Sequence, residues 1–231
     1  TLPALSSTDE SRLNEIVRLA KGELVARMDA DDAMHPLRLE KQVGFLQANP
    51  ELDGVTTGAY LIDAEDRPIA LLPGRQPSAQ EVLARGGFLH PSLLARKSWF
   101  EAHPYSLDYP RAEDRELFVR TFKTSRLHVL SEPLYFYRWF GVPRGKTLRI
   151  GYRSERKVMW KYGPNLVGWG PSLRLIALSF GKELLTWFLE WTHLEKGFQT
   201  RRAFQPLLEM DQREALRTLK VIRETCVPGW D

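Results

Sequence analysis

Three carboxylates directly follow an apolar segment near the start of the chain. Residues 23–28 predict a buried strand, and Asp29, Asp31 and Asp32 come immediately after it. In open α/β sheets, ligands bind beyond the carboxyl ends of strands. Like charges this close repel one another unless a cation neutralises them, and carboxylate oxygens suit Mg²⁺ or Mn²⁺. The cluster therefore predicts a divalent-cation site that also binds phosphate groups.

Other arrangements share part of this acidic pattern. An EF-hand calcium loop starting at Asp29 is excluded, because Ala33 and Met34 stand where it needs an oxygen ligand and a glycine. A haloacid-dehalogenase-like phosphatase also has Asp-x-Asp after an apolar strand, but it usually has Thr or Val where this chain has Ala33. Acids that cap the next helix would account for one carboxylate and not for three. The metal–phosphate site is our first interpretation and the phosphatase the second.

Two further groups could do chemistry. Glu113 and Asp114 open a predicted helix over residues 113–123, where a carboxylate stays ionised and could act as a general base or simply cap the helix. His90 lies in a predicted strand over residues 88–95 and is followed by Pro91 and Ser92. A lone histidine on a strand either lines a pocket or is a satisfied structural group. Both alternatives stay open for each site.

The elements that would position these groups alternate along the chain. Helices are expected from Ser7, Pro36, Ser78 and Glu113 onward, and strands over 23–28, 55–63, 68–72, 88–95, 127–130 and 134–139. Such alternation favours an α/β sheet. We expect one domain over residues 1–150 and a helical C-terminal extension over residues 151–231.

The C-terminal extension is rich in aromatic residues and follows a basic segment. Its apolar residues between Leu173 and Trp191 keep helical spacing, which favours a core or docking helix over an interfacial one. Charges in this helix argue against a membrane span. Residues 138–161 contain eight Lys or Arg and one acid, Glu155, so this segment either attracts phosphates, an anionic membrane or nucleic acid, or is a solvated face.

Composition bounds the compartment and the class of protein. With 43% hydrophobic residues, the 231-residue chain can bury an ordinary core. Its single cysteine excludes a disulfide framework and a zinc site of the cysteine type. The first residues lack a signal-peptide pattern, so we expect a cytoplasmic location, at the inner face of the membrane if the extension docks there.

Four segments together resemble the family 2 glycosyltransferases of the GT-A fold, in the order and approximate spacing of that family. They are residues 20–42 with the acidic cluster, Leu89–Ser92, Ala112–Phe118 and Pro133–Arg138. The resemblance implies a GT-A (Rossmann-like) mixed sheet, a nucleotide-sugar donor, and a divalent cation, Mn²⁺ or Mg²⁺, on the donor diphosphate. It also implies transfer, with inversion, to a hydroxyl of a saccharide or lipid-linked acceptor.

The resemblance also implies roles for the residues of the donor site. Asp31 and Asp32 would bind the metal, with no means of separating their roles. Asp29 would contact the ribose of the donor or the water shell of the metal. His90 would line the pocket, and Arg138 would contact the diphosphate.

On the acceptor side, Asp114 would be the general base and Glu113 would position the acceptor. The family commonly has a histidine after the Tyr-x-Arg residues, where this chain has Trp139 and Phe140. The loss of that ligand would lower the affinity for metal.

The family's N-terminal nucleotide-binding strands do not precede Leu13, so we expect an N-terminally incomplete sheet and weak nucleotide binding by this chain alone. An inactive remnant that binds a partner or a membrane is the alternative function. Nucleic acid is not expected as a partner, because the aromatic residues follow helical spacing and form no stacking platform.

Overall fold

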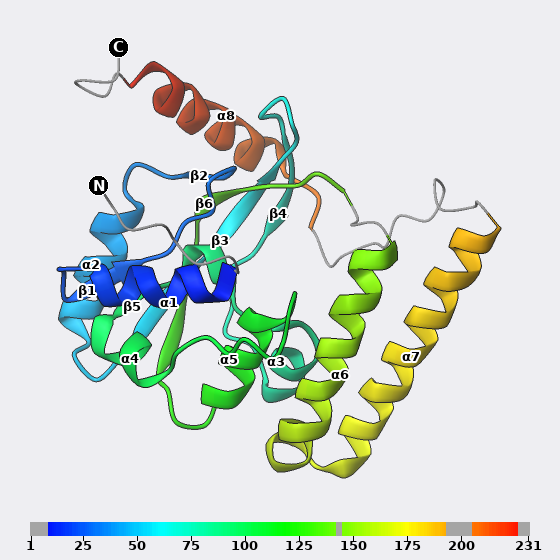
Figure 1. Cartoon of the computed structure of the whole chain (residues 1–231). Helices are drawn as coiled ribbons and strands as arrows, with labels where there is room; N and C mark the ends of the chain where they lie inside the picture. Colours follow the sequence, from blue (N-terminus) through cyan, green and yellow to red (C-terminus); the bar gives the residue numbers. More distant parts are fainter. Residues whose placement is uncertain (1–8, 142–144, 193–204, 226–231) are drawn as a thin grey trace.

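The computed structural model describes residues 9–141, 145–192 and 205–225 and places a mixed β-sheet between helices (Figure 1). The strands are β1 (Leu24–Ala26), β2 (Ala33–Met34), β3 (Gly54–Ile62), β4 (Pro68–Leu72), β5 (Leu94–Arg96) and β6 (Leu127–Arg138). Their order in the sheet is β1-β5-β3-β6-β2, and β4 pairs with β3. The β3–β6 pair is parallel and the other pairs are antiparallel. The predicted α/β class is confirmed.

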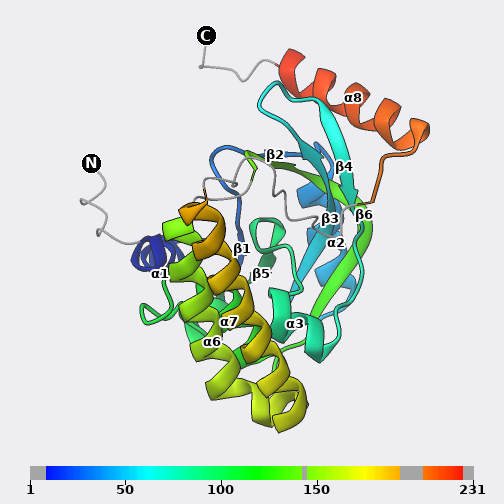
Figure 2. The same ribbon diagram turned by 90° about the vertical axis from the view of Figure 1, so that its right-hand side faces the viewer.

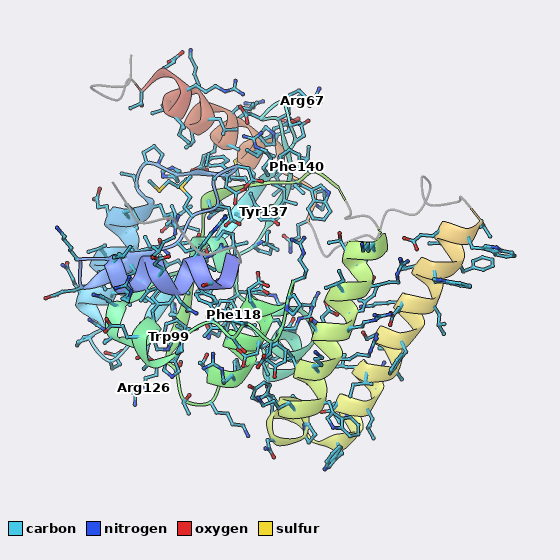
Figure 3. All side chains as sticks on the ribbon, viewed as in Figure 1. Arg67, Trp99, Phe118, Arg126, Tyr137 and Phe140 are labelled. Carbon is cyan, nitrogen blue, oxygen red and sulfur yellow. The ribbon has the colours of Figure 1, made fainter. Side chains whose placement is uncertain are left out.

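Helices cover both faces of the sheet. They are α1 (Asp9–Leu19), α2 (Arg38–Ala48), α3 (Ala79–Arg85), α4 (Lys97–Ala102), α5 (Glu113–Thr121), α6 (Gly145–Val167), α7 (Trp169–Trp191) and α8 (Glu209–Glu224). Helix α2 packs on one face through Leu46 against Val55 and Leu94. The main core lies on the other face, among α3 to α6, and includes Trp99 and Phe118 (Figure 3). The alternation of side chains along β5 thus divides its residues between two cores.

Several elements form where the sequence places them. The hairpin of β3 and β4 matches the two predicted strands around a polar turn. Helix α3 begins with the predicted capping box, in which Ser78 Oγ accepts from the Glu81 backbone N–H and Glu81 Oε2 accepts from the Ser78 N–H. This reciprocal pair satisfies two N–H groups that the first turn of the helix leaves without partners.

The prediction of a strand through His90 is wrong. His90–Ser92 forms a short 3-10 helix, η1, and β5 begins only at Leu94. Pro91 has no N–H to donate to a neighbouring strand, which disfavours it inside a sheet. Instead, the Ser92 N–H donates to Leu89 O at 3.0 Å, and the Leu93 N–H to His90 O at 3.1 Å. The motif is therefore a tight turn that leads into β5.

The two predicted strands over 127–130 and 134–139 form one strand, β6. Its pairing with β3 shifts register between Thr57 and Ala59, where Leu130 and Tyr135 are the successive partners. Pro133 lies in this irregular part, where a missing N–H costs no regular ladder bond. Local turn signals mark the irregularity, but the shared partner β3 keeps both halves in one strand.

The C-terminal helices contact the rest of the chain in two places. Helix α6 packs on α3 and α5, and Val158 and Met159 join the main core. Tyr162 of α6 donates to Glu116 of α5 at 2.7 Å. Helix α8 packs on the far end of the sheet, where Ala215 and Leu219 meet residues of β3 and β6. The division of the chain at residue 150 stays a prediction.

Helix α7 runs beside α6 at the edge of the molecule. Figure 2 is turned so that α7 lies nearest the viewer, with α6 behind it. The expectation that the apolar residues of this helix face a core is wrong, because most of them are exposed. Among the described residues, none of the helices combines the length and apolar character needed to cross a membrane.

Candidate active site

The acidic cluster lies in the loop that joins β1 to β2, beyond the carboxyl end of β1. The Arg27 N–H donates to the O atom of Leu93, the residue before β5, at 2.8 Å. The chain then turns, and the Asp32 N–H donates to Asp29 O at 3.3 Å. Because β1 and β2 lie at opposite ends of the strand order, this loop crosses the sheet. The three acids follow a strand as predicted, but β1 is shorter than the strand expected over residues 23–28, and it is half-buried to exposed rather than buried.

Asp32 holds the loop against β6. Its Oδ2 accepts from the Tyr135 hydroxyl at 2.8 Å, and its Oδ1 accepts from the Arg138 backbone N–H at 2.7 Å. The Tyr135 hydroxyl in turn accepts from the Asp29 N–H at 3.2 Å. Burial raises the pKa of Asp32 to about 6, against the opposing effect of these two hydrogen bonds. Both oxygens of Asp32 thus already have partners within the protein.

Asp31 is the exposed member of the cluster, and its carboxylate has no hydrogen bond or ion pair within the described part of the chain. Asp29 lies beside Arg27, with Oδ1 and Nη1 2.9 Å apart. Burial nevertheless raises the pKa of Asp29, and the charges of Asp31 and Asp114 act in the same direction. Of the three acids, Asp31 is the one whose carboxylate is open to a ligand.

The donor set fits a cation that arrives with its other ligands. No group of three His, Cys, Asp or Glu side chains stands ready to hold a metal in the described ranges. Mg²⁺ in particular is commonly bound through one or two carboxylates, with substrate phosphates and water completing the octahedron. Asp31, with Asp29 and Asp32 as neighbouring charges, suits that mode of binding.

Arg138 supports the acidic loop through its whole guanidinium group. Nε donates to Asp31 O at 2.7 Å, Nη1 to Asp63 O at 2.8 Å, and Nη2 to Asp66 Oδ1 at 2.5 Å. Such a fork of fixed donors is typical of arginine and pins the loop to the β3–β4 hairpin. Contact between Arg138 and a diphosphate stays a prediction.

The second acidic pair lies near the first. Glu113 and Asp114 occupy the first turn of α5, and Asp114 Oδ1 accepts from the Arg115 N–H at 2.7 Å. The charge of Asp114 raises the pKa of Asp29. Burial raises the pKa of Tyr105, and Asp114, Glu113 and Asp29 each add to that increase. Acids that are far apart in sequence are thus close enough for their charges to act on Tyr105.

His90 is buried below this region. Its Nε2 lies 2.8 Å from the Tyr105 hydroxyl, and its ring meets Phe118 edge-on. Burial lowers the pKa of His90 well below its ordinary value, and Arg27 adds to this effect. The neutral ring is therefore a buried hydrogen-bond partner of the Tyr105 hydroxyl. Direct contact of His90 with a donor stays a prediction.

Sequence reasoning gave no role to two residues, Tyr135 and Arg38, that hold the acidic loop in place. Tyr135 joins Asp29 to Asp32, as described above. Arg38 is fully buried, donates to Arg27 O at 2.8 Å and to Gln42 Oε1 at 2.9 Å, and lies 5.0 Å from the Tyr135 ring centre. A signal was present, because Arg38 and Gln42 are polar residues one helical turn apart on the buried side of α2.

Gln42 extends this buried network to the rest of the sheet. Its Nε2 donates to Val55 O at 3.0 Å and to Ser92 O at 2.9 Å. Ser92 Oγ accepts from the Thr57 N–H at 3.0 Å. Three of the four segments that resemble the family, residues 20–42, Leu89–Ser92 and Pro133–Arg138, are therefore joined by hydrogen bonds around the acidic loop.

Residues 10–107 match the family described as Glycosyl transferase family 2. These residues are less than half of the chain, and over them it is similar to glycosyltransferase family 2. This match favours the glycosyltransferase interpretation over the haloacid-dehalogenase-like one, and the mixed sheet agrees with the predicted α/β class.

Curated relatives in this family come from bacteria and archaea. The putative glycosyltransferase EpsE of Bacillus subtilis is 33% identical over 132 residues, which are 54% of this chain and 47% of the relative. The O-antigen biosynthesis glycosyltransferase WbnJ of Escherichia coli is 33% identical over 131 residues, 54% of this chain and 51% of the relative. An uncharacterized glycosyltransferase of Methanocaldococcus jannaschii, MJ1057, is 25% identical over 130 residues, 54% and 45% of the two chains. The chain spans about half the length of these relatives.

Solved structures with a related fold are more distant. TarS of S. aureus, residues 1–349 in complex with UDP, is 15% identical with a TM-score of 0.48, covering 74% of this chain and 49% of that one. The mannosyltransferase PcManGT from Pyrobaculum calidifontis, in complex with GDP-Man and Mn²⁺, is 15% identical with a TM-score of 0.46, covering 94% and 65%.

Proposed function

We propose that the chain contributes the metal-binding and catalytic part of an inverting glycosyltransferase that moves a sugar from a nucleotide-sugar donor to a hydroxyl acceptor. The observation that carries the proposal is the exposed Asp31 carboxylate at the end of β1, in a loop whose neighbour Asp29 senses the charge of Asp114. A phosphate-binding group and a candidate base thus face one region of the protein.

Asp31 would hold Mn²⁺ or Mg²⁺ against the diphosphate of the donor. When bound, such a cation offsets the negative charge that develops on the leaving nucleoside diphosphate. The chain's own contribution is to fix the loop. Tyr135 and the Arg138 backbone hold Asp32, and the Arg138 side chain holds the Asp31 carbonyl, so that the Asp31 carboxylate has a defined position.

Asp114 would remove the proton of the acceptor hydroxyl as its oxygen attacks the anomeric carbon, with Glu113 positioning the acceptor. The proton is lost late, as positive charge builds on the sugar, so a carboxylate is a sufficient base. Asp114 lies in the first turn of α5, where the partial positive charge of the helix N-terminus attracts a carboxylate. One displacement by the acceptor on the face opposite the leaving group gives inversion.

The acceptor is proposed to be a saccharide, free or lipid-linked. Support comes from WbnJ, which is described as an O-antigen biosynthesis glycosyltransferase and shares 33% identity with this chain over the matched half. The location that fits a nucleotide-sugar donor is the cytoplasm. The cytoplasmic location, like the activity of the whole protein, is part of the proposal.

Calorimetric titration with Mn²⁺ and nucleoside diphosphates tests the donor site. Binding of a nucleotide that depends on Mn²⁺ is expected for the wild type and for Glu51→Ala, an exposed acid on the loop before β3. It is expected to fall at least about tenfold in Asp31→Ala, because the only exposed carboxylate of the cluster is then gone. Equal binding by Asp31→Ala would remove Asp31 from the metal site, whereas no binding by the wild type would favour the inactive remnant.

A transfer assay separates binding from chemistry. Asp114→Asn is expected to bind metal and nucleotide like the wild type and to lose transfer by about 10² to 10⁴-fold, the range for a general base. Transfer at the wild-type rate in Asp114→Asn would remove that residue from the mechanism and leave the metal site untouched.

A further inference from the structure

Helix α7 has its polar and apolar sides reversed relative to a helix of a globular core. Its side toward α6 carries Ser172, Ser179, Glu183 and Glu190. Glu190 pairs with Arg149, and Glu183 pairs with Arg156 and, at 3.3 Å, with Arg153. The contact between the two helices is therefore largely polar and ion-paired; Leu175 and Ile176 pack against the main core, and most other apolar residues of α7 lie on the outside.

The outward side of α7 is a broad apolar surface. We call it the α7 face, and it consists of Leu173, Ala177, Leu178, Phe180, Leu184, Leu185, Trp187, Phe188 and Trp191. Leu184 is 70% exposed and Trp191 is 71% exposed. At 100° per residue these positions cover about half of the helix circumference, which is wider than the stripe of an ordinary surface helix. Figures 1 and 2 agree that no described element covers this side. Contiguous exposed apolar surface of this kind marks an interaction site.

Cations border the α7 face and lack acidic partners. Arg174 and Lys182 lie on α7 itself, are exposed, and have no ion pair with a described residue. Trp160 of α6 meets Trp169 of α7 edge-on, with ring centres 5.9 Å apart, so the adjoining side of α6 continues the surface. Lys157, one helical turn before Trp160, is exposed on that side. All three glutamates of the two helices are already paired, since Glu155 contacts Arg115 at 3.0 Å.

We propose that the α7 face lies in the interface of an anionic lipid bilayer, parallel to its surface, with its leucine and aromatic side chains among the acyl chains and its bordering cations on the headgroups. Interfacial helices combine these features: a wide apolar side, Trp and Phe beside Leu, and Lys or Arg at the border. A span is not required, and none of the described helices could form one.

The border of cations argues against a second copy of the chain as the occupant. A two-fold contact through the α7 face would bring Arg174 and Lys182 of both copies to the same interface, with no unpaired glutamate of α6 or α7 to face them. Anionic headgroups supply the missing negative charge. The inference does not depend on catalysis, because none of these residues belongs to the acidic loop or to the start of α5.

Vesicle flotation of the full chain tests the inference. Vesicles of phosphatidylcholine mixed with phosphatidylglycerol are expected to carry the wild type to the top of a gradient, whereas pure phosphatidylcholine should bind it more weakly. The double variant Leu184→Glu with Phe188→Glu is expected to lose at least about tenfold in binding, because two apolar side chains that would insert into the bilayer become charged. Arg174→Gln with Lys182→Gln should weaken binding only to the anionic vesicles, by about fivefold per charge.

A matched control places two glutamates elsewhere. Leu107→Glu with Met210→Glu alters two exposed apolar residues outside the α7 face and is expected to bind vesicles like the wild type. Asp31→Ala should also bind normally, so failure of the proposed enzyme function leaves this test intact. Thermal unfolding checks that each variant is folded.

Three results would overturn the proposal. They are a wild type that stays with neither kind of vesicle, equal loss in the control variant, and a soluble dimer that the Leu184→Glu and Phe188→Glu changes dissociate. The last result would assign the α7 face to a second copy of the chain.

Discussion

At the scale of single residues, the three aspartates of the acidic loop have different surroundings. Asp32 is held by Tyr135 and by the Arg138 N–H, Asp29 lies against Arg27, and Asp31 is exposed. The sequence shows three aspartates in a row of four and cannot rank them, because their difference comes from partners about 100 residues away. The order of burial now favours Asp31 as the residue that meets a cation.

The raised pKa values of this loop predict how ligand binding depends on pH. Burial raises the pKa of Asp32 from 3.8 to about 6, and that of Asp29 is also raised. Mn²⁺-dependent nucleotide binding is therefore expected to fall as the pH is lowered from 8 through 6, because the carboxyls take up protons and the negative charge of the loop is lost. Tyr135→Phe removes a hydrogen bond that lowers the pKa of Asp32, so the midpoint should move to higher pH.

Calorimetry over a pH series measures this midpoint, and thermal unfolding in the absence of ligand is its control. A carboxyl whose pKa is higher in the folded state than in the unfolded state favours folding when it is protonated, so the Asp32 contribution to stability increases as the pH falls from about 6 towards 3.8. A loss of binding at low pH is thus not an effect of Asp32 on unfolding. Binding that is constant between pH 8 and 5 would exclude these carboxyls from the ligand site.

At the scale of secondary-structure elements, α2 positions the acidic loop from behind the sheet. Arg38 and Gln42 connect the end of β1 to β3 and to η1 through Arg27 O, Val55 O and Ser92 O. Burial lowers the pKa of Arg38 to about 10, which still leaves its guanidinium charged at neutral pH. Arg27 O, Gln42 Oε1 and the Tyr135 ring compensate this buried cation in part, while its Nη1 has no hydrogen-bond partner among the described residues.

Arg38→Leu is expected to lower the free energy of unfolding by about 3 kcal/mol, because it leaves Arg27 O and Gln42 Oε1 buried without their donors. Arg38→Lys should recover little of this loss, since one ammonium group cannot reproduce the fork. Urea denaturation followed by circular dichroism measures the change. Arg217→Leu, an exposed arginine on α8, is the control and should unfold like the wild type. A loss below about 1 kcal/mol for Arg38→Leu would mean that the network is not required for the fold.

The contact between α6 and α7 needs a residue without a side chain at one point. A Cβ on Gly163 would stand 2.6 Å from Ser172 Oγ, which is itself hydrogen-bonded to Gly168 O at 2.7 Å. Gly163→Ala should therefore destabilise the protein by about 1–2 kcal/mol, although alanine is the better helix former. Ser172→Ala in the same chain should restore part of the loss.

Gly151 in the same helix provides the matched comparison for this prediction. A Cβ there meets nothing within 4 Å, so Gly151→Ala should stabilise the protein by about 0.5–1 kcal/mol. Thermal unfolding of the three variants and the wild type measures these differences. Similar effects of Gly163→Ala and Gly151→Ala would show that α7 does not press on α6 at this position.

At the scale of the whole molecule, the sequence predicts what depends on neighbouring residues. The β3–β4 hairpin, the capping box of α3 and the placement of the acidic loop all follow from local patterns, and all are present. The joining of two predicted strands into β6 depends on the distant partner β3. The outward direction of the α7 apolar side depends on ion pairs with α6. Periodicity shows that a helix has two sides, but only its packing partner decides which side is outside.

One polar connection described above gains meaning if α7 rests on lipid. Tyr162 and Glu155 of α6 contact Glu116 and Arg115, the two residues that follow Asp114 on α5. The candidate base Asp114 and the helix pair α6 and α7, which would face the bilayer, are thereby parts of one rigid block. Such a block fixes the distance of the Asp114 carboxylate from the lipid headgroups. Acceptors whose hydroxyl is presented at that distance would react, and the same sugar free in solution would have no such advantage.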